Sequence, residues 1–457
     1  MYNAIIAKIQ NILPHDNANR LEICIVCNTP VIVSKDMYIA GQLVVYFGSD
    51  GQLSREFGAA NDLIPLYTEI DGVKTKTNGS FFDDNLRVKP INLRGKKSDG
   101  FMLPLSCLEF TGVVVKEGDE FDSLGGIPIC NKYITRATRE ARTGSRSKLK
   151  RLDTMTTTFH EHIDTKNFLR ELQRINLGNR IIISEKIHGT SGRTSYAYTV
   201  RTKRNPFVAG LLHRCNITTT NKTIQQLWNT FTAAVDKWFT VETKGYELLC
   251  GTRRVVLNAT SNAVGFYGSD EFRWGLHNKF AAYLHKGEEV FYEVVGYTTT
   301  GGAIQPSHNP AKVSKDFAKK HGAEINYSYG CLPSTCAMYV YRICMTNEDG
   351  VQLDYTWDQV VGRCAELGLQ TVPVLLNEEA PCETHEKLLE LVEHCSQLDS
   401  RIAGQVFSEG VAIRVESGLN VEYLKLKSDA FKYMESYSKD TGEVDMEEAQ
   451  DEYIAEP

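Results

Sequence analysis

Residues 1–130 alternate short β-branched runs with turn residues. The runs "AIIAKI", "LEICIVC", "PVIVS", "GQLVVYFG" and "GFMLPL" are separated by stretches that contain Pro, Asn, Asp and Gly. Short apolar runs bounded by such turn signals are typical of strands in a small β-barrel or sandwich. We therefore expect an N-terminal β-domain over residues 1–130.

The pattern changes over residues 159–432, where strand-like runs mix with helical periodicity. Apolar residues recur at helical spacing in "WDQVVGRCAELG" (357–368) and "THEKLLELVEHCSQL" (384–398), which predicts two packing helices. Residues 207–241 have the character of an insertion, helical around "TIQQLWNTFTAAVDKWF". After Lys432 the chain turns acidic, so residues 433–457 are expected to form a flexible tail. The predicted fold class is α+β.

A basic segment, residues 131–158, joins the two parts. Its run "NKYITRATREARTGSRSKLKR" holds one acidic residue, Glu140, among many cations, including Arg146, Lys148 and Lys150. Such a run is compatible with a solvated linker and equally with a strip that contacts RNA phosphates. The sequence leaves both interpretations open.

Composition narrows the class of protein. A chain of 457 residues is long enough for two or three domains, and its net charge of -6 gives no general attraction to polyanions. Any nucleic-acid surface must then be local. No stretch approaches the length of an apolar membrane span, and the N-terminus lacks signal-peptide features. We expect a cytoplasmic or nuclear protein, not secreted, with no membrane partner.

The 12 cysteines are scattered along this long chain. Cys24 and Cys27 have the spacing of zinc ligands, but in a strand-like run their side chains would point to opposite faces. Free cysteines are among the most buried residue types. We therefore expect reduced core thiols rather than disulfides or a zinc site.

The segment "RIIISEKIHGTSGR" (180–193) ends an apolar strand on Lys186, directly before a Gly-Thr-Ser turn. A lysine so placed can attack an electrophile, but an ordinary lysine is almost fully protonated at neutral pH. Burial or neighbouring cations must favour the neutral amine. If Lys186 is a nucleophile, we therefore expect further cations from other segments to converge on it.

Other segments supply suitable groups. Lys425 and Lys427 are two positions apart in "VEYLKLKSDAFK", so they share one face of a strand. The carboxylates of Glu293 and Glu409 are expected at two strand ends, and Arg253 and Arg254 lie beside a strand. Tyr339 and Tyr341 alternate with other residues and are expected to face one side. Paired lysines with carboxylates suit a phosphate and a divalent cation in one pocket, and tyrosine rings suit a base.

Six of these segments together resemble a known family. In chain order, "EKIHGTSGR", "GTRR", "FYEVVGY", "MYVYRI", "SEGVAIRV" and "YLKLKSDAFK" resemble motifs I, Ia, III, IIIa, IV and V of the covalent nucleotidyltransferases. The K-x-H-G form of the first motif resembles the RNA ligase branch, as does "FHEHIDTKN" upstream, whose residues have no assigned role. One such match is weak, but six in order are specific. The resemblance implies an ATP-grasp-like nucleotidyltransferase domain of antiparallel sheets flanked by helices over residues 159–432.

The resemblance also implies roles for individual residues. ATP would transfer AMP to Lys186, Lys425 and Lys427 would neutralise the α-phosphate, and Glu409 would bind Mg²⁺ or Mn²⁺. Glu293 would hold the ribose, either Tyr339 or Tyr341 would stack on adenine, and Arg193 and Arg253 would orient phosphate, sugar or RNA. The implied nucleotide site comprises Glu185, Lys186, Ile187, Arg193, Arg253, Glu293, Tyr339, Tyr341, Lys425 and Lys427.

The N-terminal part carries a second resemblance. "AKIQNILPHDNANRLEICIV" and "NLRGKKSDGFMLPL" are similar to the two signatures of OB-fold tRNA-binding modules. An OB barrel binds nucleic acid on one strand face and its loops, which implies RNA contacts from Arg94, Lys96 and Lys97. A barrel used only for stability or protein docking is the alternative.

Together the two resemblances imply a monomeric ATP-dependent RNA ligase that seals 3'-OH and 5'-phosphate RNA ends, at nicks in a duplex. Three alternatives remain: a non-catalytic RNA-binding protein with a degenerate ligase domain, a DNA ligase, and a GTP-dependent capping enzyme. The intact lysines and carboxylates argue against the first. The lack of an R-x-D-K-like motif after Lys427 argues against the other two.

Overall fold

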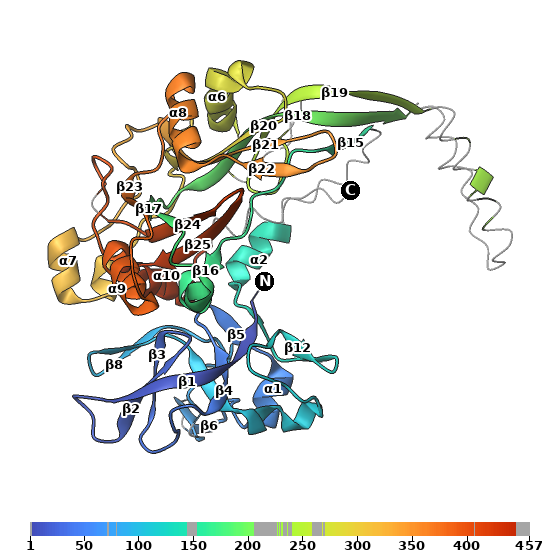
Figure 1. Ribbon diagram of the computed structural model, residues 1–457. Helices are drawn as coiled ribbons and strands as arrows, with labels where there is room; N and C mark the ends of the chain where they lie inside the picture. Colours follow the sequence, from blue (N-terminus) through green and yellow to red (C-terminus); the bar gives the residue numbers. More distant parts are fainter. Residues whose placement is uncertain are drawn as a thin grey trace.

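The computed structural model (Figure 1) describes residues 2–70, 73–78, 80–143, 153–204, 240–257, 267, 270–405 and 407–444, with five more between 226 and 235. Arg146, Lys148 and Lys150 lie outside the described residues, as do nearly all of the predicted insertion and residues 445–457 of the predicted tail.

The N-terminal unit is built on one long bent strand. This strand, β1 (Ala4–Pro14), pairs with β4 (Leu43–Phe47) along its first half and with β2 (Leu21–Val26) along its second, and its register shifts between Ile9 and Asn11. The sheet order is β10-β4-β1-β2-β3, with β3 (Thr29–Ser34) and β10 (Phe101–Pro104) at its ends and β11 (Glu120–Phe121) paired with β1.

The sequence resemblance led us to expect a closed barrel here. Within the described residues, the two end strands of this sheet do not pair with each other, so the structure is a half-barrel. The chain between them instead forms two separate hairpins: β6 (Tyr67–Ile70) with β7 (Val73–Lys76), and β8 (Ile91–Leu93) with β9 (Lys96–Ser98). The expectation of an α+β fold is confirmed, whereas the closed barrel is not found.

Short elements complete this unit and cover its core. They are β5 (Gly51–Leu53), α1 (Arg55–Ala60), the 3-10 helix η1 (Leu105–Thr111), β12 (Ser123–Leu124), β13 (Ile127–Pro128) and β14 (Cys130–Lys132). The half-barrel buries one cluster around Phe47 and Phe57 and another around Ile9 and Val26. Because apolar residues alternate along these strands, each face of the half-barrel sheet packs against its own buried cluster.

The rest of the chain forms two sheets. The larger has the order β15-β18-β20-β21-β22, with β19 on the second edge of β18: β15 (Asp153–Thr157), β18 (Thr190–Arg204), β19 (Thr240–Gly251), β20 (Glu288–Gly296), β21 (Cys336–Thr346) and β22 (Gln352–Asp354). The smaller has the order β16-β25-β24-β17-β23: β16 (Lys166–Asn167), β17 (Arg180–Lys186), β23 (Val374–Glu379), β24 (Gly410–Ser417) and β25 (Asn420–Lys427).

Alternation along β17 directs its residues to two cores. Ile181 and Ile183 belong to the cluster under α9, whereas Ile182 belongs to the cluster that also contains Val290 and Tyr292 of the larger sheet. Because side chains two apart in a strand share a face, Ile182 and Lys186 point to the side of the larger sheet. The nucleophile candidate therefore faces the space between the two sheets.

Helices flank both sheets, as Figure 1 shows. They are α3 (Phe168–Glu171), α6 (Glu271–Phe280), α7 (Lys315–His321), α8 (Trp357–Leu367), α9 (His385–Ser396) and α10 (Asp429–Asp440), with 3-10 turns η2 (Leu172–Arg174), η3 (Ala281–Tyr283) and η4 (Pro310–Lys312). The helices α8 and α9 confirm the two predicted from periodicity. A capping box at Thr356 starts α8, and Gly368 in the left-handed region ends it.

The structure differs from the sequence prediction at both flanks of this part. The predicted linker contains α2 (Arg136–Thr143) and also β15, which pairs with β18 in the larger sheet. The predicted tail begins at residue 433, but α10 continues to Asp440 because its apolar residues Phe431 and Met434 pack into the core. A flexible tail from residue 433 is therefore wrong for residues 433–440.

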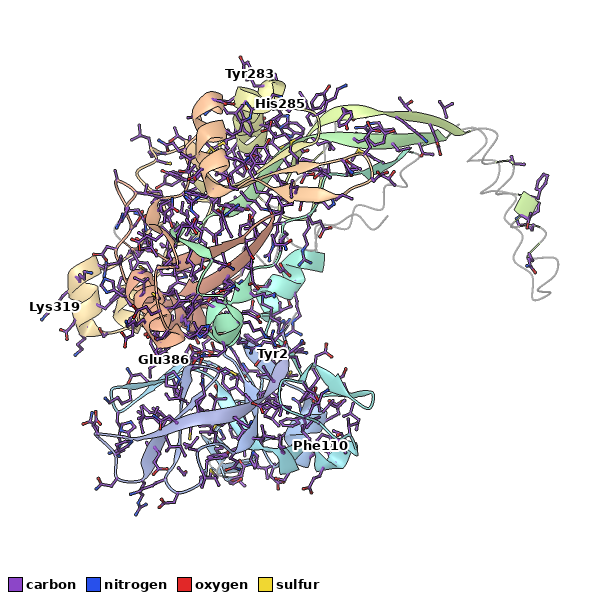
Figure 2. The ribbon with its side chains drawn as sticks, viewed as in Figure 1. Tyr2, Phe110, Tyr283, His285, Lys319 and Glu386 are labelled. Carbon is purple, nitrogen blue, oxygen red and sulfur yellow. The ribbon has the colours of Figure 1, made fainter. Side chains whose placement is uncertain are left out.

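The helix α10 also holds the N-terminal unit. Arg87, which is 4% exposed, pairs with Asp440 at 2.7 Å, and Lys432 pairs with Asp99 at 2.7 Å. Tyr2 and Glu386 lie where the two parts meet (Figure 2). Polar contacts of this kind, made largely from one helix, join the half-barrel to the smaller sheet.

No helix in the described part of the chain is long and apolar enough to cross a membrane. The eleven described cysteines are all free thiols, and Cys24 is fully buried. All eleven are buried or half-buried, as expected of core thiols.

Candidate active site

Three neighbouring strands of the smaller sheet meet at Gly410. The strand register places Lys186 opposite Gly410 on one side and Lys427 opposite it on the other, and Glu409 immediately precedes it. Gly410 has φ +147°, and a Cβ there would collide with the backbone of Leu426 and Lys427. A glycine at this point therefore allows the strand ends to approach closely enough to bring three charged residues together.

The carboxylate of Glu409 is surrounded by basic groups. Its Oε2 accepts a hydrogen bond from Lys186 Nζ at 2.7 Å and lies 3.5 Å from His188 Nδ1, and its Oε1 lies 3.8 Å from Lys427 Nζ. Glu409 is 2% exposed. Burial raises the pKa of Glu409, but Lys186, His188 and Lys427 outweigh burial and lower it to about 2. The group is therefore an anion held between two lysines and a histidine.

Lys425 and Lys427 project as the sequence predicts. Leu424 and Leu426 of the same strand are buried in the cluster under α9, so the two lysines lie on the opposite face. Burial lowers the pKa of Lys427, but Glu435 and then Glu409 more than offset it and raise that pKa above its ordinary value. Lys427 thus remains a fixed positive charge at neutral pH.

His188 is enclosed by aromatic rings that sequence reasoning did not identify. Its ring centre lies 4.5 Å from Tyr327, 4.9 Å from Phe431 and 6.1 Å from His308. His308 also bonds Tyr327 Oη at 2.7 Å, and burial, followed by His188, lowers the pKa of His308 to about 4. Tyr327 and His308 lie in 301–330, in stretches outside the helical turns η4 and α7, where no regular period could reveal them.

The turn after Lys186, residues 187–189, leads directly into β18 at Thr190 and is fixed to its surroundings by hydrogen bonds. The Gly189 amide donates to Glu293 Oε1 at 3.1 Å, the Gln305 side chain donates to the Gly189 carbonyl, and the His188 amide donates to Tyr329 Oη at 2.8 Å. A Cβ at Gly189 would collide with the Val294 carbonyl. The predicted ribose-binding Glu293 is therefore held within hydrogen-bonding distance of the turn that follows Lys186.

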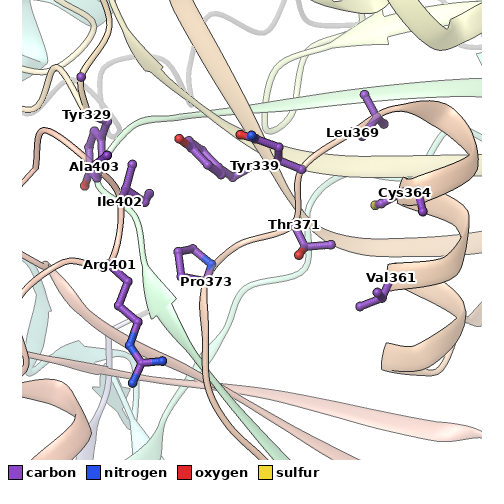
Figure 3. A pocket seen from close by; sticks show the side chains of 13 residues that line it. Tyr329, Tyr339, Val361, Cys364, Leu369, Thr371, Pro373, Arg401, Ile402 and Ala403 are labelled. Carbon is purple, nitrogen blue, oxygen red and sulfur yellow. The ribbon is translucent and has the colours of Figure 1, made fainter.

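A pocket of about 650 Å³ opens beside this turn (Figure 3). Its walls include Tyr329, Tyr339, Cys364 of α8 and Arg401. Glu185, which is 2% exposed, accepts the Arg401 amide at 2.9 Å through Oε2, while its Oε1 has no hydrogen-bond partner among the described residues. Burial raises the pKa of Glu185. The pocket thus combines an aromatic wall with a neighbouring buried acceptor.

The two tyrosines of "MYVYRI" do not share one environment. In the pairing of β20 with β21, Phe291 lies opposite Arg342 and Tyr292 opposite Val340, so Tyr341 is the extra residue of a β-bulge. Tyr339 lines the pocket, whereas the Tyr341 ring lies 5.4 Å from that of His162. Tyr339 lies opposite Glu293 in the register, and burial and then Glu293 raise the pKa of Tyr341, so the two rings do lie on one face, although their neighbours differ.

Arg193 is a buried structural contact in this structure. Its Nε donates to the Thr252 carbonyl at 2.7 Å, and its Nη1 donates to the carbonyls of Phe159, at 3.2 Å, and His160. The side chain is 1% exposed, and burial lowers its pKa to about 10. Arg193 thus joins two strands to the upstream segment "FHEH".

Arg253 and Arg254 lie at the end of β19 beside the same segment. Arg253 Nη2 pairs with Asp164 Oδ1 at 2.6 Å, and Arg254 Nη2 lies 3.8 Å from Asp164 Oδ2. The Arg254 side chain is 35% exposed, against 16% for Arg253. The structure therefore places both arginines around one carboxylate.

The predicted RNA contacts of the N-terminal unit lie on the β8–β9 hairpin. Lys96 pairs with Asp16 at 2.5 Å, Lys97 pairs with Asp429 of α10 at 2.5 Å, and Arg94 Nη1 donates to the Asn17 carbonyl at 3.3 Å. His15 Nε2 lies 3.1 Å from the Leu93 carbonyl. The two signatures of the resemblance therefore pack against each other, and Lys97 faces the junction of the two parts.

In the described residues, no three His, Cys, Asp or Glu side chains converge as a preformed metal site. A divalent cation such as Mg²⁺ is commonly held by one or two carboxylates together with substrate phosphates and water. The single buried carboxylate of Glu409, beside lysines that suit a phosphate, fits that kind of site.

Comparisons with known proteins agree with this arrangement. A family model described as RNA ligase matches residues 179–434. No curated protein matches the chain. A Naegleria gruberi RNA ligase mutant solved with AMP and Mn is 14% identical, with a TM-score of 0.56 and coverage of 94% of this chain and 97% of that chain. A second mutant, solved with ATP and Mn, is 15% identical, with a TM-score of 0.55 and coverage of 95% and 99%. At this identity the likeness shows a common fold.

Proposed function

Because the chain belongs to the RNA ligase family, we propose that it is an ATP-dependent RNA ligase that seals 3'-OH and 5'-phosphate ends, at nicks in a duplex. The observation that carries this proposal is the convergence of Lys186 and Lys427 on Glu409, with 2.7 Å and 3.8 Å contacts, at three adjacent strand ends. One nucleophile candidate, one fixed cation and one buried anion thus meet at these strand ends. A pocket of nucleotide size is connected to them through its wall residue Tyr329, whose Oη accepts a hydrogen bond from the His188 amide.

The proposed first step is transfer of AMP to Lys186. The Nζ atom attacks the α-phosphorus of ATP, a P–N bond forms, the bond to pyrophosphate breaks, and the amine releases a proton. Attack needs the neutral amine, so the 2.7 Å ion pair with Glu409 must open first. Lys425 and Lys427 stabilise the charge on the α-phosphate.

The pocket beside Lys186 is the proposed site of adenine. Tyr339 offers a ring for stacking. Glu185 lies behind the pocket wall, where its Oε2 accepts a hydrogen bond from the amide of the lining residue Arg401. Ile187, which is 4% exposed, adds an apolar contact next to the nucleophile. Glu293 would hold the ribose, and Arg253 the phosphate or RNA end. Tyr341, beside His162, is the alternative stacking residue.

Glu409 would hold the divalent cation, Mg²⁺ or Mn²⁺. Such a cation supplies positive charge that stabilises phosphate oxygens as charge develops on them. Glu409 can serve it because its depressed pKa keeps it anionic throughout the physiological range. The same carboxylate would then be withdrawn from Lys186.

The later steps act on RNA. AMP passes from Lys186 to the 5'-phosphate, and the 3'-OH then attacks that phosphate, which forms the phosphodiester and releases AMP. We propose residues 159–432 as the nucleotidyltransferase domain and residues 1–130 as an OB-type RNA-binding module with Arg94, Lys96 and Lys97 near RNA. The basic segment 131–158 would add phosphate contacts. The enzyme is proposed to act as a monomer.

Self-labelling tests the proposal. The protein is incubated with α-labelled ATP or GTP and Mg²⁺ or Mn²⁺, then separated by denaturing electrophoresis. We expect label from ATP that acid releases and mild alkali does not, as for a P–N bond. Lys186→Ala should lower labelling at least about 1,000-fold, whereas the exposed Lys320→Ala, paired with Asp399, should label normally.

The other outcomes separate the alternatives. No label from either nucleotide contradicts the lysyl-AMP intermediate and leaves a non-catalytic RNA-binding protein. Label that persists in Lys186→Ala contradicts Lys186 as the nucleophile. Label from GTP alone indicates a capping enzyme. Sealing of nicked DNA rather than nicked RNA indicates a DNA ligase.

A further inference from the structure

A line of alternating charges leads from Lys186 to the N-terminal unit. Beyond Glu409 and Lys427, the Glu435 carboxylate of α10 pairs with Lys427 at 2.7 Å and with Lys439 at 3.3 Å. Lys439 then pairs with Asp50 of the N-terminal unit at 3.1 Å. Each contact is an ion pair, so the catalytic centre and the half-barrel are joined by a continuous electrostatic network.

The network is buried enough to be strong. The Lys439 side chain is 6% exposed and that of Glu435 19%. Burial alone would raise the pKa of Glu435, but Lys427 and Lys439 hold it well below its ordinary value. Asp50 follows Glu435 and Glu409 among the groups that raise the pKa of Lys427. Charges that are screened so little interact over several ångströms.

We propose that Glu435 is a positioning residue for Lys427 in self-adenylylation, and that Asp50 supports Glu435 through Lys439. This inference rests on the proposed function. It places two residues outside the six motifs, Asp50 and Glu435, in the first chemical step, which needs no RNA.

Two carboxylates compete for Lys427. Its ammonium lies 2.7 Å from Glu435 and 3.8 Å from Glu409. Without Glu435, Lys427 would move toward Glu409 and occupy the carboxylate that the metal requires. Glu435 thus holds Lys427 where it can meet the α-phosphate and leaves Glu409 available.

The primary test is Glu435→Gln in the full-length protein, assayed for self-adenylylation without RNA. We expect the maximal rate to fall at least about tenfold, while the ATP concentration for half-maximal rate changes less than about threefold. Glu435→Asp, which keeps the charge, should recover part of the rate. A residue that only supports the fold would lower thermal stability without this split between rate and affinity.

The coupling to the N-terminal unit is tested by Asp50→Asn, with Lys89→Gln as its matched control. Lys89 also bridges the two parts, because it pairs with Asp440 of α10 at 3.2 Å and with Asp83 of its own unit at 3.1 Å. Among its ion pairs with described residues there is none to Glu435 or Lys439. We expect Asp50→Asn to slow adenylylation about threefold and Lys89→Gln to leave the rate unchanged.

Each result decides the inference. Label on wild type with an unchanged rate in Glu435→Gln overturns it, as does an equal loss in Glu435→Gln and Glu435→Asp. If Glu435→Gln does not fold, Asp50→Asn against Lys89→Gln decides alone, and equal rates overturn the coupling. No label on wild type contradicts the proposed function instead.

Discussion

Lys186 and Arg193 lie seven positions apart in one motif, yet their surroundings are opposite. Lys186 ends a strand of the smaller sheet and pairs with one carboxylate, whereas Arg193 lies in the larger sheet and donates to three backbone carbonyls. A carboxylate can be drawn away by a metal ion and replaced by a phosphate. The carbonyls that Arg193 contacts belong to the backbone just beyond β15 and β19, so a metal ion cannot draw them away as it can a side-chain carboxylate.

The difference separates two uses of a buried cation. On the smaller sheet the charges sit at strand ends, next to a pocket, with the Lys186 side chain 23% exposed. On the larger sheet Arg193 is enclosed, and its guanidinium also lies 4.1 Å from the centre of the Phe159 ring. We infer that the first cluster serves chemistry and that the second holds the "FHEH" segment against the sheet.

The largest effect that we expect from changing either cation is a loss of folding stability when Arg193 is replaced. Arg193→Met should lower the free energy of unfolding by about 4 kcal/mol, because three buried carbonyls lose a charged donor. Urea unfolding followed by tryptophan fluorescence measures this change. The adenylylation rate of the folded fraction should stay within about fivefold of wild type. A stable Arg193→Met that does not adenylylate would show instead that Arg193 touches the nucleotide.

A smaller effect is expected from the pH dependence of Glu409. A carboxyl whose pKa is lowered on folding stabilises the protein above its unfolded pKa, and this contribution is lost as the pH falls toward the folded value. For Glu409 the two values are 4.5 and about 2. The stability difference between wild type and Glu409→Gln should therefore shrink by about 2 kcal/mol between pH 6 and pH 3.

Unfolding curves at several pH values test this expectation. Arg193→Met serves as the control, since its stability difference from wild type should change little over the same range. A difference between wild type and Glu409→Gln that stays constant from pH 6 to pH 3 would contradict the lowered pKa. Lys186 and Lys427 would then stabilise the Glu409 carboxylate less than the 2.7 Å contact indicates.

Regular periodicity explains which parts of the molecule could be predicted. The helix α8 and the shared face of Lys425 and Lys427 follow from spacings of 3.6 and 2, which the chain keeps in those segments. Tyr339 and Tyr341 also share one face as predicted, but a bulge adds one residue at Tyr341, and of the two only Tyr339 lines the pocket. His308 lies in an irregular segment, where no period links position to direction.

Long-range pairing explains other errors. Glu435 lies in a segment that sequence composition assigned to the tail, although Ser428 as a cap and the apolar Phe431 and Met434 mark a helix there. The proposed role of Glu435 depends on its ion pairs with Lys427 and Lys439, which only the folded structure shows. Arg193 has the residue type and motif of a phosphate ligand, and only the positions of Phe159, His160 and Thr252 show that its donors are occupied.

The smallest expected effect distinguishes the two tyrosines by affinity. Tyr339→Leu should raise the ATP concentration for half-maximal adenylylation about tenfold, because the loss of one stacked ring costs about 1–3 kcal/mol. Tyr341→Leu, its matched control across the bulge, should change that concentration less than about twofold, since Tyr341 does not line the pocket. Titration of the adenylylation rate with ATP measures both. The reverse order, with the larger change in Tyr341→Leu, would move adenine to the side of His162 and would assign the pocket of Figure 3 to another group.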